Sequence, residues 1–101
     1  MDGGDLKLDA KGEPSVVWRR EMQVYSGGVG GTAETLVGDG KNGIVVPASK
    51  PVIVWSAPDG LRAGKDLLDA KGSFASSARL ADGSALAAWE SDGVIKTRRI
   101  P

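Results

Sequence analysis

Hydrophobic residues along the chain occur in short alternating or continuous runs, each bounded by glycine, proline, asparagine or aspartate. Runs of this kind with closely spaced turn residues are typical of β-strands. Glycine and proline interrupt the chain so often that helices of the usual ~8–20 residues have little room. We therefore predict strands at 15–20, 22–26, 34–37, 44–48, 52–57, 61–63, 66–70, 74–80, 85–90 and 94–100.

The residues between these runs favour hairpins. Asparagine or aspartate followed by glycine tolerates positive φ and so favours the type I′ turns of tight hairpins. An all-β meander follows from this pattern. The pairs lie at 39–40, 42–43, 59–60, 82–83 and 92–93.

The chain is also similar to itself. Trp18, Trp55 and Trp89 each end a similar phrase and lie 37 and 34 residues apart. The phrase Leu-Asp-Ala-Lys-Gly occurs at 8–12 and again, identically, at 68–72. It precedes the next tryptophan by 21 residues in the second case but by only 10 in the first. The sequence therefore predicts a period near ~35 residues, with one strand and its turn missing from the first unit.

A repeat of ~35 residues with four short strands has the size of a β-propeller blade. We predict an all-β fold of antiparallel four-stranded blades, about two and a half in number, in an incomplete ring. The tryptophans are expected to fill the gaps between neighbouring blades rather than to form sugar-stacking platforms. The predicted units are a partial first blade with a Gly-rich loop at 1–40, a second blade at 41–72 and a third blade lacking its outer strand at 73–101.

The run Ala78–Glu90, followed by Asp92–Lys96, resembles blades of the sialidase-like (BNR-repeat) β-propeller superfamily. The run Lys50–Trp55 with Asp59–Arg62 is similar. The resemblance covers Lys41 to Pro101 and concerns the scaffold. It implies that a ligand would be a carbohydrate, held at one end of the channel among inner-strand residues and connecting loops.

The catalytic apparatus of that superfamily is not matched here. Its Asp-box, Ser-x-Asp-x-Gly-x-x-Trp, does not occur, and its three arginines, Tyr–Glu pair and aspartate cannot be placed residue by residue. We therefore predict a binding or structural scaffold without catalytic residues. The alternative is a fragment of a sialidase-like glycoside hydrolase.

Too few units are present to close a ring, because propellers usually contain ~4–8 blades. We expect the chain to be completed by copies of itself, as a homo-oligomer, or by further blades of a longer chain. If 8–12 forms an outer strand, it would complete a neighbouring blade, such as the last one, by strand exchange. A small open sheet or sandwich is the remaining alternative.

Composition narrows the chemistry. The chain has 13 basic and 13 acidic side chains, and neither cysteine nor histidine. This balance favours neither nucleic acid nor a membrane surface as a partner. Disulfides, thiolate metal sites and Ser–His–Asp triads are excluded. No secretory signal is visible, so localisation stays open: a soluble chain, secreted or periplasmic if it derives from a longer precursor.

Arginines are the remaining candidates for binding. Arg19, Arg20 and Arg62 could clamp a carboxylate such as that of an acidic sugar. Neighbouring arginines on a strand point to opposite faces, however, and this favours solvated or edge-protecting roles. The Gly-rich stretch 27–33 lacks the βαβ context of a dinucleotide site, and 39–43 is expected to be a hairpin turn rather than a calcium loop. We predict no cofactor and no metal.

Overall fold

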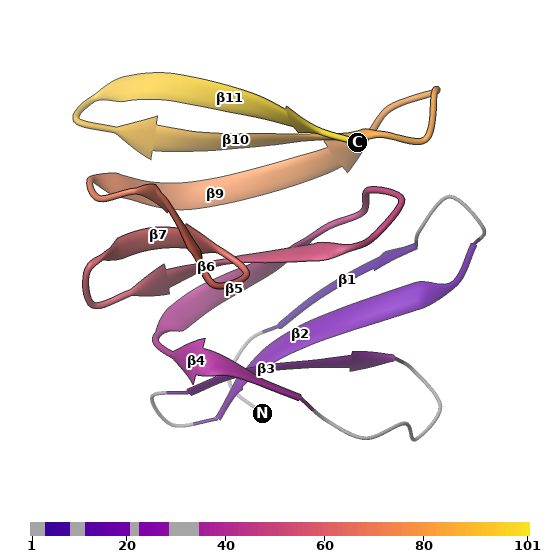
Figure 1. The fold of residues 1–101 in the computed structure, drawn as a ribbon, viewed down its shortest axis with the longest axis horizontal. Coiled ribbons are helices and arrows are strands. Elements are labelled where there is room, and N and C mark those ends of the chain that lie inside the picture. The colour runs from indigo at the N-terminus through magenta and orange to yellow at the C-terminus, as the bar shows by residue number, and fades with distance from the viewer. Residues whose placement is uncertain (1–3, 9–11, 21–22, 29–34) are drawn as a thin grey trace.

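The computed structural model describes residues 4–8, 12–20, 23–28 and 35–101 (Figure 1). Within these residues the chain forms strands and no helix, as the sequence predicted. Its eleven strands are β1 (Gly4–Leu8), β2 (Pro14–Arg20), β3 (Gln23–Gly28), β4 (Thr35–Asp39), β5 (Lys41–Val46), β6 (Val52–Ala57), β7 (Gly60–Ala63), β8 (Asp66–Asp69), β9 (Gly72–Arg79), β10 (Ala85–Ser91) and β11 (Val94–Ile100).

The strands form three antiparallel sheets in chain order. Sheet 1 has the order β1-β2-β3-β4, sheet 2 the order β5-β6-β7-β8, and sheet 3 the order β9-β10-β11. Each sheet is a meander in which every strand pairs with its neighbours in sequence. The all-β, multi-sheet part of the prediction is confirmed.

The three sheets pack face to face, with their first strands side by side (Figure 1). Hydrogen bonds to a single residue of β5 join these strands. The amide of Val45 donates to Asp5 Oδ2 of β1 at 2.9 Å, and the carbonyl of Val45 accepts from Ser77 Oγ of β9 at 2.6 Å. The first strands therefore lie next to one another although they belong to different sheets.

Two apolar layers fill the spaces between the sheets. Val17 and Val24 of sheet 1 pack against Val45 and Trp55 of sheet 2. On the other face of sheet 2, a second cluster joins it to sheet 3 through Val46, Ala48, Val54, Leu61, Ala85, Ala87 and Trp89. Among the described residues, sheet 2 is thus covered on both faces, whereas sheets 1 and 3 are each covered on one.

The tryptophans occupy equivalent places on the second strand of each sheet. Trp55 is 5% exposed and packs against Gly38 of sheet 1. Trp89 is also 5% exposed, and its Nε1 donates to Asp69 Oδ2 of sheet 2 at 2.9 Å. The prediction that tryptophans fill the gaps between neighbouring units is confirmed for these two.

The prediction that the first unit lacks a strand is wrong. Gly4–Leu8 forms β1, which pairs with β2 and gives sheet 1 four strands. Leu8 ends a first strand, whereas Leu68 lies in the fourth strand of sheet 2 and Gly72 begins β9. The identical phrases therefore occupy different places in the fold. Leu8 is already paired within its own sheet, so it does not form the outer strand on which the predicted strand exchange depended. Residues 9–11 of the phrase lie outside the described residues.

The asparagine–glycine and aspartate–glycine pairs have three different roles. Asp92 and Gly93 have φ values of 55° and 81°, as a type I′ hairpin requires, and the pairs at 59–60 and 82–83 also lie at hairpins. Residues 39–40 instead link sheet 1 to sheet 2, and 42–43 lie inside β5. The predicted hairpin at 39–43 is therefore wrong. Most of the predicted Gly-rich loop, residues 29–34, lies outside the described part of the chain.

Candidate ligand site at the ends of the first strands

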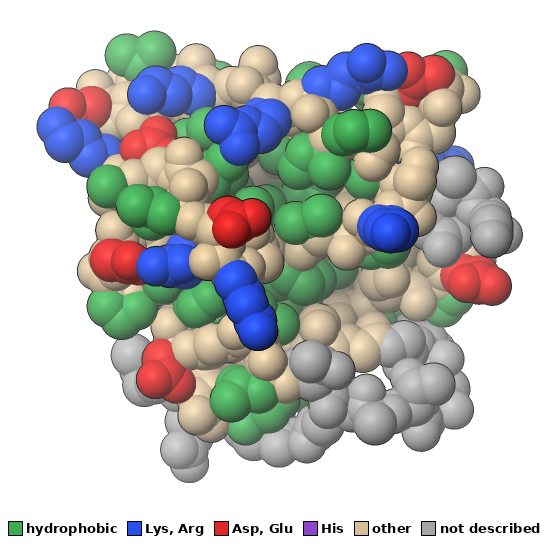
Figure 2. Space-filling view, in the orientation of Figure 1, with side chains coloured by type: hydrophobic (Ala, Val, Ile, Leu, Met, Phe, Trp, Pro, Cys, Tyr) green, Lys and Arg blue, Asp and Glu red, His purple; other side chains and the backbone are tan. Residues whose placement is uncertain are grey.

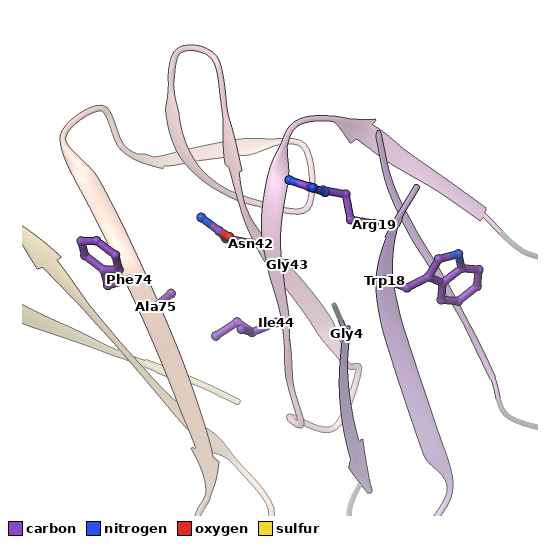
Figure 3. A pocket seen from close by; sticks show the side chains of 8 residues that line it. All are labelled: Gly4, Trp18, Arg19, Asn42, Gly43, Ile44, Phe74 and Ala75. Atoms are coloured by element: carbon purple, nitrogen blue, oxygen red, sulfur yellow. The ribbon is translucent and has the colours of Figure 1, made fainter. Parts of the chain in front are cut away.

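A cavity of about 840 Å³ lies where the first strands begin (Figure 3). All three sheets contribute to it: β1 and β2 from sheet 1, β5 from sheet 2 and β9 from sheet 3. Such a convergence of several elements on one concavity is the usual setting of a small-molecule site. The lining residues are Gly4, Trp18, Arg19, Asn42, Gly43, Ile44, Phe74 and Ala75.

Two matching β-bulges shape this cavity. In β5 the pairing with β6 shifts between Lys41 and Ile44, and in β9 the pairing with β10 shifts after Ser73. The first residue of each bulge, Asn42 or Phe74, has a positive φ, 54° and 53° respectively. A bulge redirects a side chain, and bulges with unusual backbone angles are frequent at functional sites. The two bulges place an amide and an aromatic ring at the same cavity.

Gly43 lets the bulged end of β5 approach sheet 1 closely. A Cβ at this position would lie 2.8 Å from Val17 Cγ2 and 3.1 Å from Val24 Cγ1. Any side chain there would therefore push β5 away from β2 and β3. The glycine sets how near the cavity wall of sheet 2 comes to that of sheet 1.

Arg19 contributes a positively charged guanidinium to the site. Because side chains alternate along a strand, Arg19 lies on the same face of β2 as Val17, toward sheet 2. Figure 3 shows its side chain extending from β2 toward Asn42, while the Trp18 indole points away on the opposite side of β2. Of the two predicted arginines whose side chains the structure describes, Arg19 and Arg62, Arg19 lines the cavity.

Arg62 does not lie with Arg19 at this cavity. The guanidinium of Arg62 donates to both carboxylate oxygens of Asp59, at 3.1 and 2.6 Å, and to the Lys65 carbonyl at 2.6 Å. The hydrogen bonding between Arg62 and Asp59 raises the pKa of Arg62 and lowers the pKa of Asp59. Arg62 thus closes a β7–β8 turn at the surface. Arg20 ends β2, and its side chain lies outside the described residues.

Phe74 and Asn42 are site residues that sequence reasoning missed. The Phe74 side chain is 78% exposed, which is unusual for a phenylalanine, and it lines the cavity from sheet 3. The Asn-Gly pair at 42–43 does carry a local signal of positive φ, although the sequence alone suggested a turn. Nothing in the residues around Phe74 marks a bulge.

The lining combines a guanidinium, an amide and an exposed aromatic ring with apolar Ile44. A guanidinium and an amide can bind carboxylate and hydroxyl groups, and an aromatic face can stack against an apolar sugar face. Among the residues that the structure describes, no carboxylate lines this cavity. The described residues contain no cluster of acidic side chains able to hold a metal ion.

Figure 2 shows charges of both signs spread over one face of the molecule, with hydrophobic side chains between them. A second, more apolar cavity of about 540 Å³ includes Leu36, Ile53 and Ile100. Among the residues that the structure describes, no helix is long and apolar enough to cross a membrane. No family model matches the chain, and neither the curated proteins nor the solved structures contain a significant match.

Proposed function

We propose that this chain is a β-propeller-type repeat scaffold that binds a carbohydrate at the ends of its first strands. Three sheets in sequence order, packed face to face with their first strands adjacent, support this proposal. In a propeller, the first strands of the blades surround the central channel. Further sheets, from a second copy or from a longer chain, would complete the ring.

The cavity that joins Arg19, Asn42 and Phe74 is the single observation that carries the binding role. The groups come from three different sheets, so the site depends on the face-to-face packing rather than on one local motif. Arg19 favours an acidic sugar, because a guanidinium binds a carboxylate through paired charge-assisted hydrogen bonds. Phe74 supplies the stacking surface.

Calorimetric titration with an acidic sugar and with its neutral counterpart tests this function. We expect the acidic sugar to bind more tightly, and Arg19→Gln to weaken its binding about tenfold or more, because a hydrogen bond to a charged group is worth ~1.5–3 kcal/mol. Arg62→Gln is the matched control, since Arg62 is held by Asp59 away from the cavity. Equal effects of the two variants, or no binding of either sugar, would contradict the proposal.

A scaffold role fits the cavity better than the sialidase-like hydrolase alternative. Glycoside hydrolysis ordinarily needs two carboxyl groups flanking the scissile bond, whereas the described lining of this cavity contains none. We therefore expect binding without turnover. Release of a fluorescent leaving group from a synthetic sialoside, at a rate proportional to protein concentration, would support the hydrolase instead.

A further inference from the structure

The strand register makes residues of the three sheets equivalent when the tryptophans are aligned. In each sheet, the residue that follows the tryptophan pairs with a residue of the third strand. That third-strand residue is Val24 in sheet 1, Leu61 in sheet 2 and Ile95 in sheet 3. Val24 is 0% exposed because sheet 2 covers it, and Leu61 is 1% exposed because sheet 3 covers it. Ile95 is 69% exposed. The position that is core in two sheets is therefore open in the third.

The opposite face of the stack shows the same relation. The residue two positions before the tryptophan pairs with a residue of the first strand. That first-strand residue is Leu6 in sheet 1 and Val45 in sheet 2. Val45 is 0% exposed, whereas Leu6 is 53% exposed. Trp18 is only partly buried and stacks on Tyr25, with ring centroids 6.1 Å apart. Trp55, its equivalent in sheet 2, is 5% exposed.

Two open faces are thus defined by the alternation of side chains along the strands. The leading face, on the side of sheet 1 away from sheet 2, consists of Leu6, Leu8, Val16, Trp18 and Tyr25. The trailing face, on the side of sheet 3 away from sheet 2, consists of Ser76, Ala78, Leu86, Ala88 and Ile95, bordered by Glu90, Thr97 and Arg99.

The two faces differ in side-chain size. The leading face carries two exposed leucines beside a stacked tryptophan and tyrosine. The trailing face consists mostly of alanine and serine around Leu86 and Ile95. Within the chain, Trp55 already packs a bulky ring onto positions without side chains, because it lies over Gly38 and Gly40. A bulky face against a face of small residues therefore continues the packing between sheets 1 and 2.

We propose that a second copy of this chain docks head to tail, with the leading face of each copy on the trailing face of the other. The inference rests on the propeller-type arrangement of the proposed function and specifies what completes it. Two copies of three sheets give six, within the ~4–8 that close a propeller. The two interfaces are then identical, and both open faces are covered. Docking two leading faces would instead place bulky side chains against bulky side chains.

Native mass spectrometry and sedimentation equilibrium test this arrangement. The 10.4 kDa chain is expected to give a species of twice that mass. Leu6→Glu blocks the leading face and Ile95→Glu the trailing face, so each variant alone should dissociate with a dissociation constant raised about 30-fold or more. Leu67→Glu is the matched control, because Leu67 is 49% exposed on β8 and belongs to neither face. Circular dichroism verifies that every variant retains its strands.

Mixing the two blocked variants separates head-to-tail docking from other dimers. The Ile95→Glu copy keeps an intact leading face and the Leu6→Glu copy an intact trailing face. A mixed pair therefore has one unaltered interface, whereas either variant paired with itself has none, so an equimolar mixture should form mixed pairs through that one interface. A monomeric wild-type chain, a dimer that survives Ile95→Glu, a mixture without mixed pairs, or growth to ever larger masses would each overturn the proposal. Sugar binding is measured in a separate experiment. A chain that binds no sugar can still be shown to form the dimer, and a chain that forms no dimer can still be shown to bind sugar.

Discussion

The absence of a side chain at Gly38 determines how closely sheet 1 approaches sheet 2. Its φ lies outside the left-handed region, so the requirement for glycine here is spatial rather than conformational. A Cβ would lie 2.8 Å from Trp55 Cζ2, and closer still to Cη2. The indole is held from its other end, where Nε1 donates to the Gly64 carbonyl at 2.9 Å. The ring therefore cannot move aside without losing that hydrogen bond.

Gly38→Ala is expected to lower the free energy of unfolding by about 1–3 kcal/mol, the usual cost of overpacking a core. Urea unfolding measures the change. Trp55→Phe removes the atoms that a new Cβ would meet, so the cost of Gly38→Ala should shrink in that background. Equal costs in the two backgrounds would show that the tryptophan is not the obstacle.

Asp69 links sheet 2 to sheet 3 through its carboxylate. The hydrogen bond from Trp89 Nε1, reinforced by those from the Lys71 amide and Ser91, lowers the pKa of Asp69 from 3.8 to about 2. Lys96 Nζ lies 3.8 Å from Oδ2 and adds a weaker attraction. A carboxylate whose pKa is lower in the folded than in the unfolded chain stabilises the fold above the unfolded pKa, and this contribution disappears as the pH falls through the folded pKa.

Asp69→Asn should therefore destabilise the protein most at neutral pH, because the amide lacks the charge that these donors stabilise. The difference in unfolding free energy from the wild type is expected to narrow below pH 3.8 and to be smallest near pH 2. Urea unfolding at a series of pH values measures it. Asp66→Asn, an exposed change on the same strand, is the matched control. A difference that stays constant with pH would contradict this account of Asp69.

At the scale of the elements, the bulge in β9 combines backbone strain with an exposed ring. Phe74 has a φ of 53°, a conformation that costs an L-residue roughly 1–2 kcal/mol. Its ring is largely exposed, so packing repays little of that cost. Backbone strain of this kind is common at functional sites, where it holds a side chain in the orientation that binding requires.

Phe74→Gly should raise the free energy of unfolding by up to about 1 kcal/mol, because glycine adopts positive φ without strain. Under the proposed function it should also weaken sugar binding, because the stacking surface is lost. Phe74→Ala isolates the two effects, since it removes the ring but keeps the strained backbone. Thermal unfolding and calorimetric titration measure them. If the alanine variant gains as much stability as the glycine variant, strain at this bulge is not the cause.

Local sequence signals predicted strands well and their connections less well. Asp92-Gly93 forms the expected hairpin because both residues adopt positive φ. Asn42-Gly43 has the same local preference, and Asn42 does adopt positive φ, but the chain continues along β5 without reversing. A preference for positive φ does not determine whether a turn or a bulge results. That outcome depends on pairing with β6, which no local pattern specifies.

The candidate site was predictable only in part, for the same reason. Alternation along a strand indicated that Arg19 and Arg20 point to opposite faces, yet it could not indicate which of them faces a neighbouring sheet. Arg62 has the same chemistry, but Asp59, three residues earlier, binds it at the surface. Phe74 looked like an ordinary strand residue. Only the arrangement of the sheets brings Arg19, Asn42 and Phe74 to one cavity.

At the scale of the whole molecule, the tryptophan spacing was the more reliable sign of repetition. Trp18, Trp55 and Trp89 lie on β2, β6 and β10, the second strands of the three sheets. The identical Leu-Asp-Ala-Lys-Gly phrases do not mark equivalent places. A tryptophan at a sheet interface is constrained by packing on all sides, whereas a short polar phrase suits many connections. Buried, bulky residues therefore indicate repeat units better than exact matches in turn-like segments.

The one-tryptophan-per-sheet arrangement also gives the protein a built-in optical probe at each layer. Trp55 reports on the boundary between sheets 1 and 2, Trp89 on that between sheets 2 and 3, and Trp18 on the open side of sheet 1. Indole emission moves to shorter wavelengths when water is excluded from the ring. Variants that retain a single tryptophan would therefore show, without any added label, which layer separates first when the molecule unfolds and whether the Trp18 side becomes dry at high concentration.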